Sequence, residues 1–374
     1  MKKIYAMLLL SLLLLSGCGE KESSEPVQKI NEITPPTVAD IPLLEKDLYL
    51  PENEKSEKKL VFRGNVTQED EIIFLYEYQT GKKLEFQLAR LQPDDTWEVS
   101  KPKWGKALLK ETSNPLSAIS VYSDGSYLAM IQPENDLPLF YHLMPDGTVT
   151  KWELPDGILE WEDGFHEITD GMFLTEQNQI LLTTYKIEVD ESSGKPFEGL
   201  GPETGRLLIY DPYTKKLVSE RDYVGMAGNI FITDKYVFCS KDSEIQAYLL
   251  DGGGIQSVYK DKELEKAAEK NSPVAPFCTY SGGKYAYWYT ELGIYRFDVS
   301  LTDKPENTVE KIISSEYYPE TDKEYFGVNQ MICNEDGNTT TIYVRGLPYS
   351  LKTDDEEDVH VDAAEQIFTR YVVQ

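Results

Sequence analysis

The chain of 374 residues is poor in the side chains on which most enzyme centres depend. It contains only three histidines, His142, His166 and His360, and no pair of histidines or cysteines has the spacing of a zinc site. The Gly-x-Ser-x-Gly elbow of serine hydrolases is missing. The glycine run 252–254 lacks the residues that complete a phosphate-binding loop. The sequence therefore predicts no catalytic constellation, no metal site and no cofactor.

Basic residues are also scarce, since 37 Lys and Arg face 65 Asp and Glu and give a formal net charge of −28. A field of this sign repels nucleic acid, so we expect no nucleic-acid partner. We interpret most of the acidity as surface solvation, and we expect the acidic run 354–358 to be a solvated loop.

Helical periodicity is nearly absent, which argues against an α/β solute-binding protein, because that fold needs helices alternating with strands. One short charged helix is predicted at 261–271. Cysteine is rare as well. Besides Cys18 there are Cys239, Cys278 and Cys333, an odd number that excludes a complete disulfide framework. We interpret the three as small buried hydrophobes, with a single disulfide among them left open.

The N-terminus carries the most specific motif in the chain. Lys2 and Lys3 precede an apolar run at 4–15, which is shorter than the roughly 20 residues of a spanning helix. The sequence Leu-Ser-Gly-Cys at 15–18 follows at once and resembles the lipobox of bacterial lipoproteins. This resemblance implies that 1–17 are a cleaved signal peptide and that Cys18 carries the lipid, palmitate included. It also implies a protein anchored in the cell membrane or outer membrane, facing outside the cytoplasm.

The segment after the lipobox has few large apolar residues and many Glu, Ser, Pro and Thr. Such a segment cannot bury enough apolar surface to offset its chain entropy. We therefore predict a flexible, lipid-anchored linker over 18–41 and one folded domain over 42–374, with an ordered extension packed on the domain as the alternative for 19–40.

The domain is predicted to be all-β, because short alternating runs are separated by turn signals. In the unit 116–157, Asp-Gly pairs at 124–125, 146–147 and 156–157 mark tight turns. Asp-Gly favours type I′ hairpins, which need positive φ at both central residues. Four strands within about forty residues, all joined by short turns, form one antiparallel meander.

The same meander recurs along the chain and resembles the blades of β-propellers in general, without the Gly-His and Trp-Asp dipeptides of WD40 repeats. Six units are recognised, and a seventh could be made from pieces at both ends. Residues 46–50 are predicted to pair with the last blade and close the ring. Two packed β-sandwiches remain the alternative fold. The six units span 59–103, 116–157, 165–222, 228–260, 275–314 and 330–373.

If the fold is a propeller, the loops that enter the first strands gather at one mouth of the central channel. One such loop combines an aromatic ring, an imidazole and carboxylates, which is a plausible ligand-binding set. An ordinary connection between blades is the other interpretation of this segment. The predicted binding residues are Trp161, Glu162, His166, Glu167 and Asp170.

Two functions follow from these patterns. The first is a non-catalytic binding or scaffold module for a protein or glycan partner, favoured by the scarcity of histidine and by the 25 tyrosines, which suit strands and half-wet surfaces. The second is an envelope glycan hydrolase or lyase that uses carboxylates, tyrosine and His166.

Overall fold

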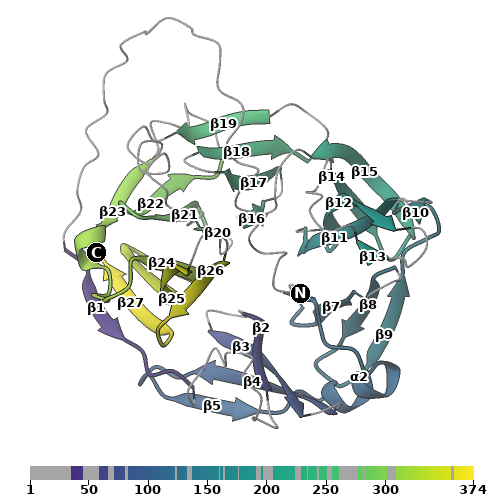
Figure 1. The fold of residues 1–374 in the computed structure, drawn as a ribbon, viewed down its shortest axis with the longest axis horizontal. Coiled ribbons are helices and arrows are strands. Elements are labelled where there is room, and N and C mark those ends of the chain that lie inside the picture. The colour runs from purple at the N-terminus through teal and green to yellow at the C-terminus, as the bar shows by residue number, and fades with distance from the viewer. Residues whose placement is uncertain are drawn as a thin grey trace, which may run out of the picture.

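The structure is a computed structural model in which six antiparallel sheets are arranged in a ring, as the blades of a β-propeller (Figure 1). Blade order follows the chain, and in blades 1, 2, 4 and 5 the first strand lies nearest the axis and the last strand at the rim. The ring confirms the predicted propeller and fixes its blade number at six. The structure describes residues 35–44, 59–65, 71–80, 83–122, 124–132, 137–159, 161–162, 165–175, 177–190, 195–196, 205–223, 229–233, 235–241, 244–250, 255–260, 277–280, 283–300, 309–354 and 358–374.

Four blades are plain four-stranded meanders. Blade 1 contains β2 (Lys59–Asn65), β3 (Ile73–Thr80), β4 (Lys83–Leu91) and β5 (Trp97–Ser100), and blade 2 contains β6 (Ala118–Val121), β7 (Tyr127–Ile131), β8 (Leu139–Leu143) and β9 (Val149–Glu153). Blade 4 contains β16 (Asn229–Ile232), β17 (Tyr236–Lys241), β18 (Glu244–Leu249) and β19 (Ile255–Lys260), and blade 5 contains β20 (Phe277–Tyr280), β21 (Tyr285–Thr290), β22 (Gly293–Asp298) and β23 (Glu310–Ser314).

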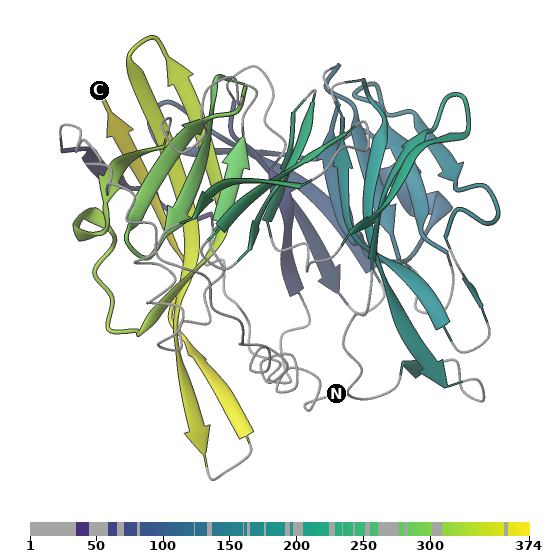
Figure 2. The ribbon, with the colours of Figure 1, turned by 90° about the horizontal axis from the view of Figure 1, so that it is seen from above.

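Blades 3 and 6 have additional strands, and in Figure 2 the hairpin of β25 and β26 extends beyond one side of the ring. In that hairpin Asp354 opposes Asp358, while 355–357, the middle of the run predicted to be a loop, lie outside the described residues. Blade 3 contains β10 (Trp161–Glu162), β11 (Phe165–Leu174), β12 (Ile180–Asp190), β13 (Lys195–Pro196), β14 (Gly205–Asp211) and β15 (Lys216–Tyr223), and blade 6 contains β24 (Tyr325–Asp336), β25 (Thr339–Asp354), β26 (Asp358–Ala363), β27 (Ile367–Val373) and β1 (Thr37–Asp40).

The turns of blade 2 show why its sequence forms tight hairpins. Gly125 and Gly147 have φ angles of 78° and 103°, in the region that L side chains avoid. The preceding aspartates cap the turns, because Asp124 Oδ1 accepts from the Ser126 amide at 2.9 Å and Asp146 Oδ1 accepts from the Thr148 amide at 2.8 Å. The tight turns predicted at these two positions are confirmed, but the predicted type I′ conformation is wrong, because Asp124 and Asp146 do not have the positive φ that it requires.

Among the described residues, the hydrophobic core forms six clusters, one at each junction between neighbouring blades. Strand β7 is buried along its whole length. Its residues Tyr127, Ala129 and Ile131 pack toward blade 1, whereas Leu128 and Met130 pack toward blade 3. Alternation along a strand therefore supplies both faces of a blade, and each face is covered only by the next blade.

The ring is closed by β1, which pairs antiparallel with β27 from Thr37↔Val372 to Asp40↔Thr369. The predicted closing segment 46–50 lies outside the described residues, and the closing position is occupied by 37–40 instead. These residues were expected in the linker 18–41, so that boundary is too late and the domain begins before residue 42. A strand from the N-terminus protects the outer edge of β27, which is the physical benefit of such closure.

The junction of blades 6 and 1 also contains a buried cation. Arg345 is 2% exposed, and its guanidinium lies 5.5 Å from the ring centre of Phe74. Its Nη1 donates to the Tyr76 hydroxyl at 3.1 Å, and its Nε donates to Gln366 Oε1 at 2.8 Å. Hydrogen bonds and ring faces compensate for the burial of this charge and join the two ends of the propeller.

One short helix, α2 (Gly105–Glu111), was not predicted, and it packs between blades 1 and 2 through Leu108. The predicted helix at 261–271 lies outside the described residues. Cys333 is buried and forms no disulfide, as predicted for a small buried hydrophobe. The side chains of Cys239 and Cys278 lie outside the described part of the structure. Among the described helices, none has the length and apolar character needed to cross a membrane.

Candidate functional site

The predicted binding residues lie at the start of blade 3, where a short strand precedes the innermost one. Trp161 in β10 opposes His166 in β11, and Glu162 opposes Phe165. Asp170 occupies a bulge of β11, between the paired residues Thr169 and Gly171. The backbone therefore brings Trp161 next to His166, while the side chains of Trp161, Glu162, His166 and Asp170 lie outside the described part of the structure. Cys18 also lies outside it.

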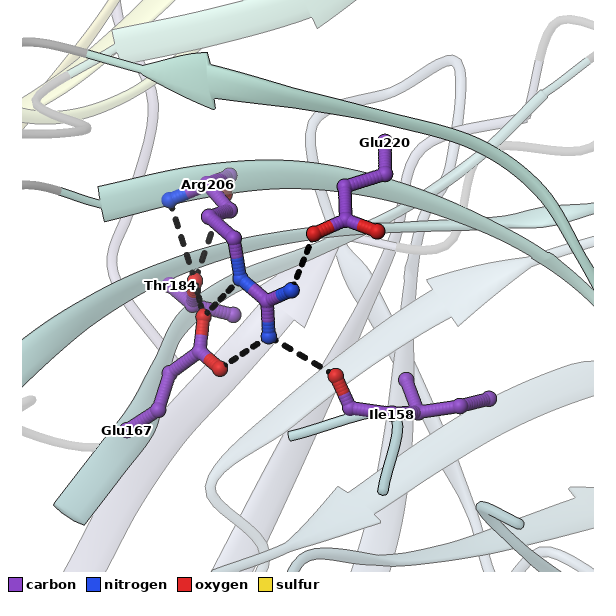
Figure 3. A network of polar contacts seen from close by, with 5 residues as sticks. All are labelled: Ile158, Glu167, Thr184, Arg206 and Glu220. Carbon is purple, nitrogen blue, oxygen red and sulfur yellow. Dashed lines mark hydrogen bonds and ion pairs between the residues drawn. The ribbon is translucent and has the colours of Figure 1, made fainter. Parts of the chain in front are cut away.

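Glu167 is the predicted binding residue whose side chain the structure describes, and it is the centre of a buried ion-pair network (Figure 3). Its Oε1 accepts from Arg206 Nε at 2.8 Å and from the Thr184 hydroxyl, and its Oε2 contacts Arg206 Nη2. The side chain of Glu167 is fully buried and that of Arg206 is 11% exposed. We call Glu167, Thr184, Arg206, Glu220 and the Ile158 carbonyl the ion-pair network.

All three guanidinium nitrogens of Arg206 have hydrogen-bond partners in the ion-pair network. Arg206 Nη2 also donates to the Ile158 carbonyl at 2.8 Å, in the connection from blade 2, and Nη1 pairs with Glu220. The hydrogen bonds to Glu167, reinforced by Glu220, raise the pKa of Arg206. Because the Glu167 carboxylate is held by a permanent cation, it is poorly suited to exchange protons with a substrate. The network holds blade 3 to the preceding connection.

A second polar and aromatic group lies between blades 2 and 3. Trp152 in β9 stacks on His142 in β8, with ring centres 4.9 Å apart and planes at 29°. Tyr213, in the turn between β14 and β15, meets Trp152 edge-on at 5.6 Å. Tyr122 completes the group, with its ring 4.9 Å from that of His142. We call Tyr122, His142, Trp152 and Tyr213 the aromatic surface.

The rings of the aromatic surface differ in their access to solvent. Tyr213 is 64% exposed and is the most exposed large hydrophobic residue among those described. Trp152 and His142 are half-buried, and Tyr122 is only 3% exposed. The aromatic surface therefore presents the Tyr213 ring to solvent, while Tyr122 anchors the group in the core.

A chain of hydrogen bonds through Ser126 determines which ring nitrogen of His142 carries the proton. Ser126 Oγ donates to Asp124 Oδ1 at 2.6 Å and lies 2.7 Å from His142 Nε2. Since the single hydroxyl proton goes to the carboxylate, Nε2 must donate to Ser126. Burial lowers the pKa of His142, and the hydrogen bonds from Ser126 lower the pKa of Asp124. At neutral pH the imidazole is therefore uncharged, and its Nδ1 is a hydrogen-bond acceptor.

The hydroxyl of Tyr122 is buried without a hydrogen-bond partner among the described residues. Burial raises the pKa of Tyr122, and the electrostatic influence of Tyr213 and Asp124 raises it further, so the hydroxyl stays protonated. An unpaired buried donor is costly, which makes it a natural position for a ligand or an ordered water.

Local patterns in the sequence indicate part of this group. They predict the Asp-Gly turn at 124–125 and the strands that contain His142 and Trp152. The register of β8 and β9 puts both rings on one face. Tyr213 belongs to the next blade, so no local pattern links it to Trp152. Among the described residues, no group of His, Cys, Asp or Glu is arranged to hold a metal ion.

No family model matches the sequence, and no curated protein matches it. A Pyrococcus horikoshii acylaminoacyl peptidase is similar in structure with a TM-score of 0.44 and 10% identity, over 82% of this chain and 52% of the peptidase, so the chain corresponds to about half of that enzyme's length.

Two other solved structures resemble most of the chain. A luciferin-regenerating enzyme has a TM-score of 0.44 and 14% identity, over 90% of this chain and 95% of its own. The Aleuria aurantia lectin bound to α-methyl-L-fucoside has a TM-score of 0.39 and 12% identity, over 82% of this chain and 94% of its own. Similarities this distant carry no argument about activity or ligand.

Proposed function

We propose that this protein is a lipid-anchored, extracytoplasmic binding module whose propeller engages a protein or glycan partner without catalysis. The observation that carries the proposal is a contrast in chemistry. The described carboxylate of the predicted site, Glu167, is neutralised inside the fold by Arg206, whereas the aromatic surface exposes the Tyr213 ring. Buried ion pairs support a scaffold, and exposed aromatic rings support recognition.

The anchor rests on the sequence before the domain. A basic start, an apolar run of 4–15 and the Leu-Ser-Gly-Cys motif favour processing at Cys18. A single acyl chain binds membranes marginally, so the multiple chains of a lipoprotein would give stable anchoring. The experiment is labelling with an alkyne analogue of palmitate in a bacterial host. We expect label on the wild-type protein and none on Cys18→Ser, which should accumulate as an unprocessed precursor. Equal labelling of both would overturn the anchor.

The binding function is tested with the full-length protein against immobilised envelope glycans and envelope proteins, together with mass spectrometry of every incubated glycan. We expect retention of one partner class and no change in mass of any glycan. Turnover that disappears in His166→Ala or Glu162→Gln would replace this proposal with the hydrolase or lyase alternative. If none of the immobilised glycans or proteins retains the protein, the proposed binding function is also overturned.

A further inference from the structure

The aromatic surface carries unused hydrogen-bonding groups at its polar edge. Asp124 is exposed and uses Oδ1 for both of its hydrogen bonds to Ser126, which leaves Oδ2 without a partner among the described residues. His142 uses Nε2 toward Ser126, and its Nδ1 has no partner in the described part of the chain. The edge therefore offers two acceptors, one charged and one neutral.

The same surface offers one donor from below. Tyr122 is 3% exposed, and its hydroxyl has no hydrogen-bond partner in the described structure. Its ring lies 4.9 Å from that of His142 and 6.4 Å from that of Trp152, so the side chain packs directly beneath the polar edge and the rings. A bound group that accepts from Tyr122 and donates to Asp124 or His142 would satisfy all three. A hydroxyl does both, and neighbouring hydroxyls on one ligand would supply several such bonds.

The exposed ring of Tyr213 provides an apolar contact for a ligand. Tyr213 projects from blade 3 onto Trp152 of blade 2, with ring centres 5.6 Å apart and planes at 70°. Two rings at this angle form an open corner against which a rigid ligand with one apolar face can pack. Because the corner joins two blades, its shape is set by the fold before any ligand arrives.

We propose that Tyr122, Asp124, His142, Trp152 and Tyr213 form a binding subsite for a neutral sugar unit of a glycan. The inference rests on the proposed binding function and specifies its ligand. A pyranose ring has an apolar C–H face for the corner of Trp152 and Tyr213 and hydroxyls at its edge for the Asp124 and His142 acceptors. One of those hydroxyls accepts from Tyr122.

Two other ligand classes fit less well. A quaternary ammonium group would suit the rings and the carboxylate, but it has no acceptor for the Tyr122 hydroxyl and no donor for His142 Nδ1. An acidic sugar is disfavoured by Asp124 and by the net charge of −28. The neutral sugar satisfies the donor, both acceptors and the rings together.

The experiment is isothermal titration calorimetry of the full-length protein in detergent micelles. The probes are neutral mono- and oligosaccharides, sialylated oligosaccharides, and choline.

Three variants are compared with the wild type. Tyr213→Ala removes the exposed ring, and Tyr122→Phe removes only the buried hydroxyl. Tyr325→Ala is a matched control at a half-buried tyrosine of blade 6. We expect a neutral saccharide to bind, with about tenfold weaker affinity in Tyr213→Ala and in Tyr122→Phe. Binding to Tyr325→Ala should equal the wild type.

The outcomes separate this inference from the proposed function. A neutral saccharide that binds equally to the wild type and to Tyr213→Ala would overturn the subsite while leaving a glycan-binding module. Binding of choline alone, unchanged in Tyr122→Phe, would replace the sugar with a cation at the same rings. Failure of all probes, together with retention of an envelope protein in the partner assay, would overturn the sugar subsite and keep the binding function.

Discussion

The ion-pair network and the aromatic surface both connect blade 2 to blade 3, yet they are built in opposite ways. In the network, Arg206 is held by two carboxylates and a carbonyl, and Glu167 is fully buried. In the aromatic surface, the Tyr122 hydroxyl has no partner among the described residues and the Tyr213 ring is open to solvent. A saturated cluster stabilises the fold, whereas an unsaturated one is available to a ligand.

The largest effect that would test this contrast is expected at the buried carboxylate. Glu167→Gln leaves Arg206 without its main counter-charge, and removal of one partner of a buried pair costs about 3 kcal/mol or more of unfolding free energy. Glu220, 45% exposed in the same network, provides the control, because Glu220→Gln should change the free energy by at most about 1 kcal/mol. Urea unfolding measures both. Equal losses would show that the network is not centred on Glu167.

The second effect has the opposite sign. Tyr122→Phe deletes a buried donor that has no partner in the described structure, so we expect the unfolding free energy to rise by about 1 kcal/mol without ligand. Tyr287→Phe is the matched control, because that hydroxyl donates to Glu335 Oε1 at 2.8 Å and its loss should lower the free energy by about 1 kcal/mol. Thermal unfolding of both variants decides the point. A less stable Tyr122→Phe would mean that the hydroxyl is already satisfied.

A smaller effect is expected from pH. Burial lowers the pKa of His142 below its ordinary value of about 6.5, with Asp124 opposing the shift. Below that ordinary value the unfolded chain binds the proton more readily than the folded protein, so stability falls as pH decreases from 7 toward the lowered pKa. Asp124 has a lowered pKa and loses its contribution only in a separate window, below about pH 4.

Urea unfolding between pH 7.5 and pH 5 measures this slope. His142→Gln keeps a group that can bond to Ser126 and does not titrate, so we expect a flatter dependence in this variant. The same slope in both proteins would assign the pH dependence to other groups.

The smallest effect is expected at the exposed ring. Tyr213→Ala should change the unfolding free energy by no more than about 0.5 kcal/mol, because the ring is 64% exposed. Tyr210, three residues earlier and 2% exposed in the core between blades 2 and 3, provides the contrast. Tyr210→Ala should lower the free energy by about 3 kcal/mol. A large loss in Tyr213→Ala would identify the ring as part of the core.

Much of the blade architecture follows from local patterns. The alternation in β7 and the Asp-Gly turns at 124–125 and 146–147 depend on residues close in the chain, so the sequence predicted them. The choice between six and seven blades did not follow, because it depends on which segment closes the ring. Residues 37–40 had no pattern that distinguished them from the linker, and only pairing with β27 gives them a strand.

The candidate site divides in the same way. The sequence determined that His142 and Trp152 share one hairpin face, because strand register is a local property. It also identified Glu167, but not the contact with Arg206, which lies 39 residues further along the chain. The tertiary structure alone decided that Glu167 is neutralised and that Tyr213 meets Trp152. Such pairs arise when separate sheets pack around a common axis, and no periodicity within one strand encodes them.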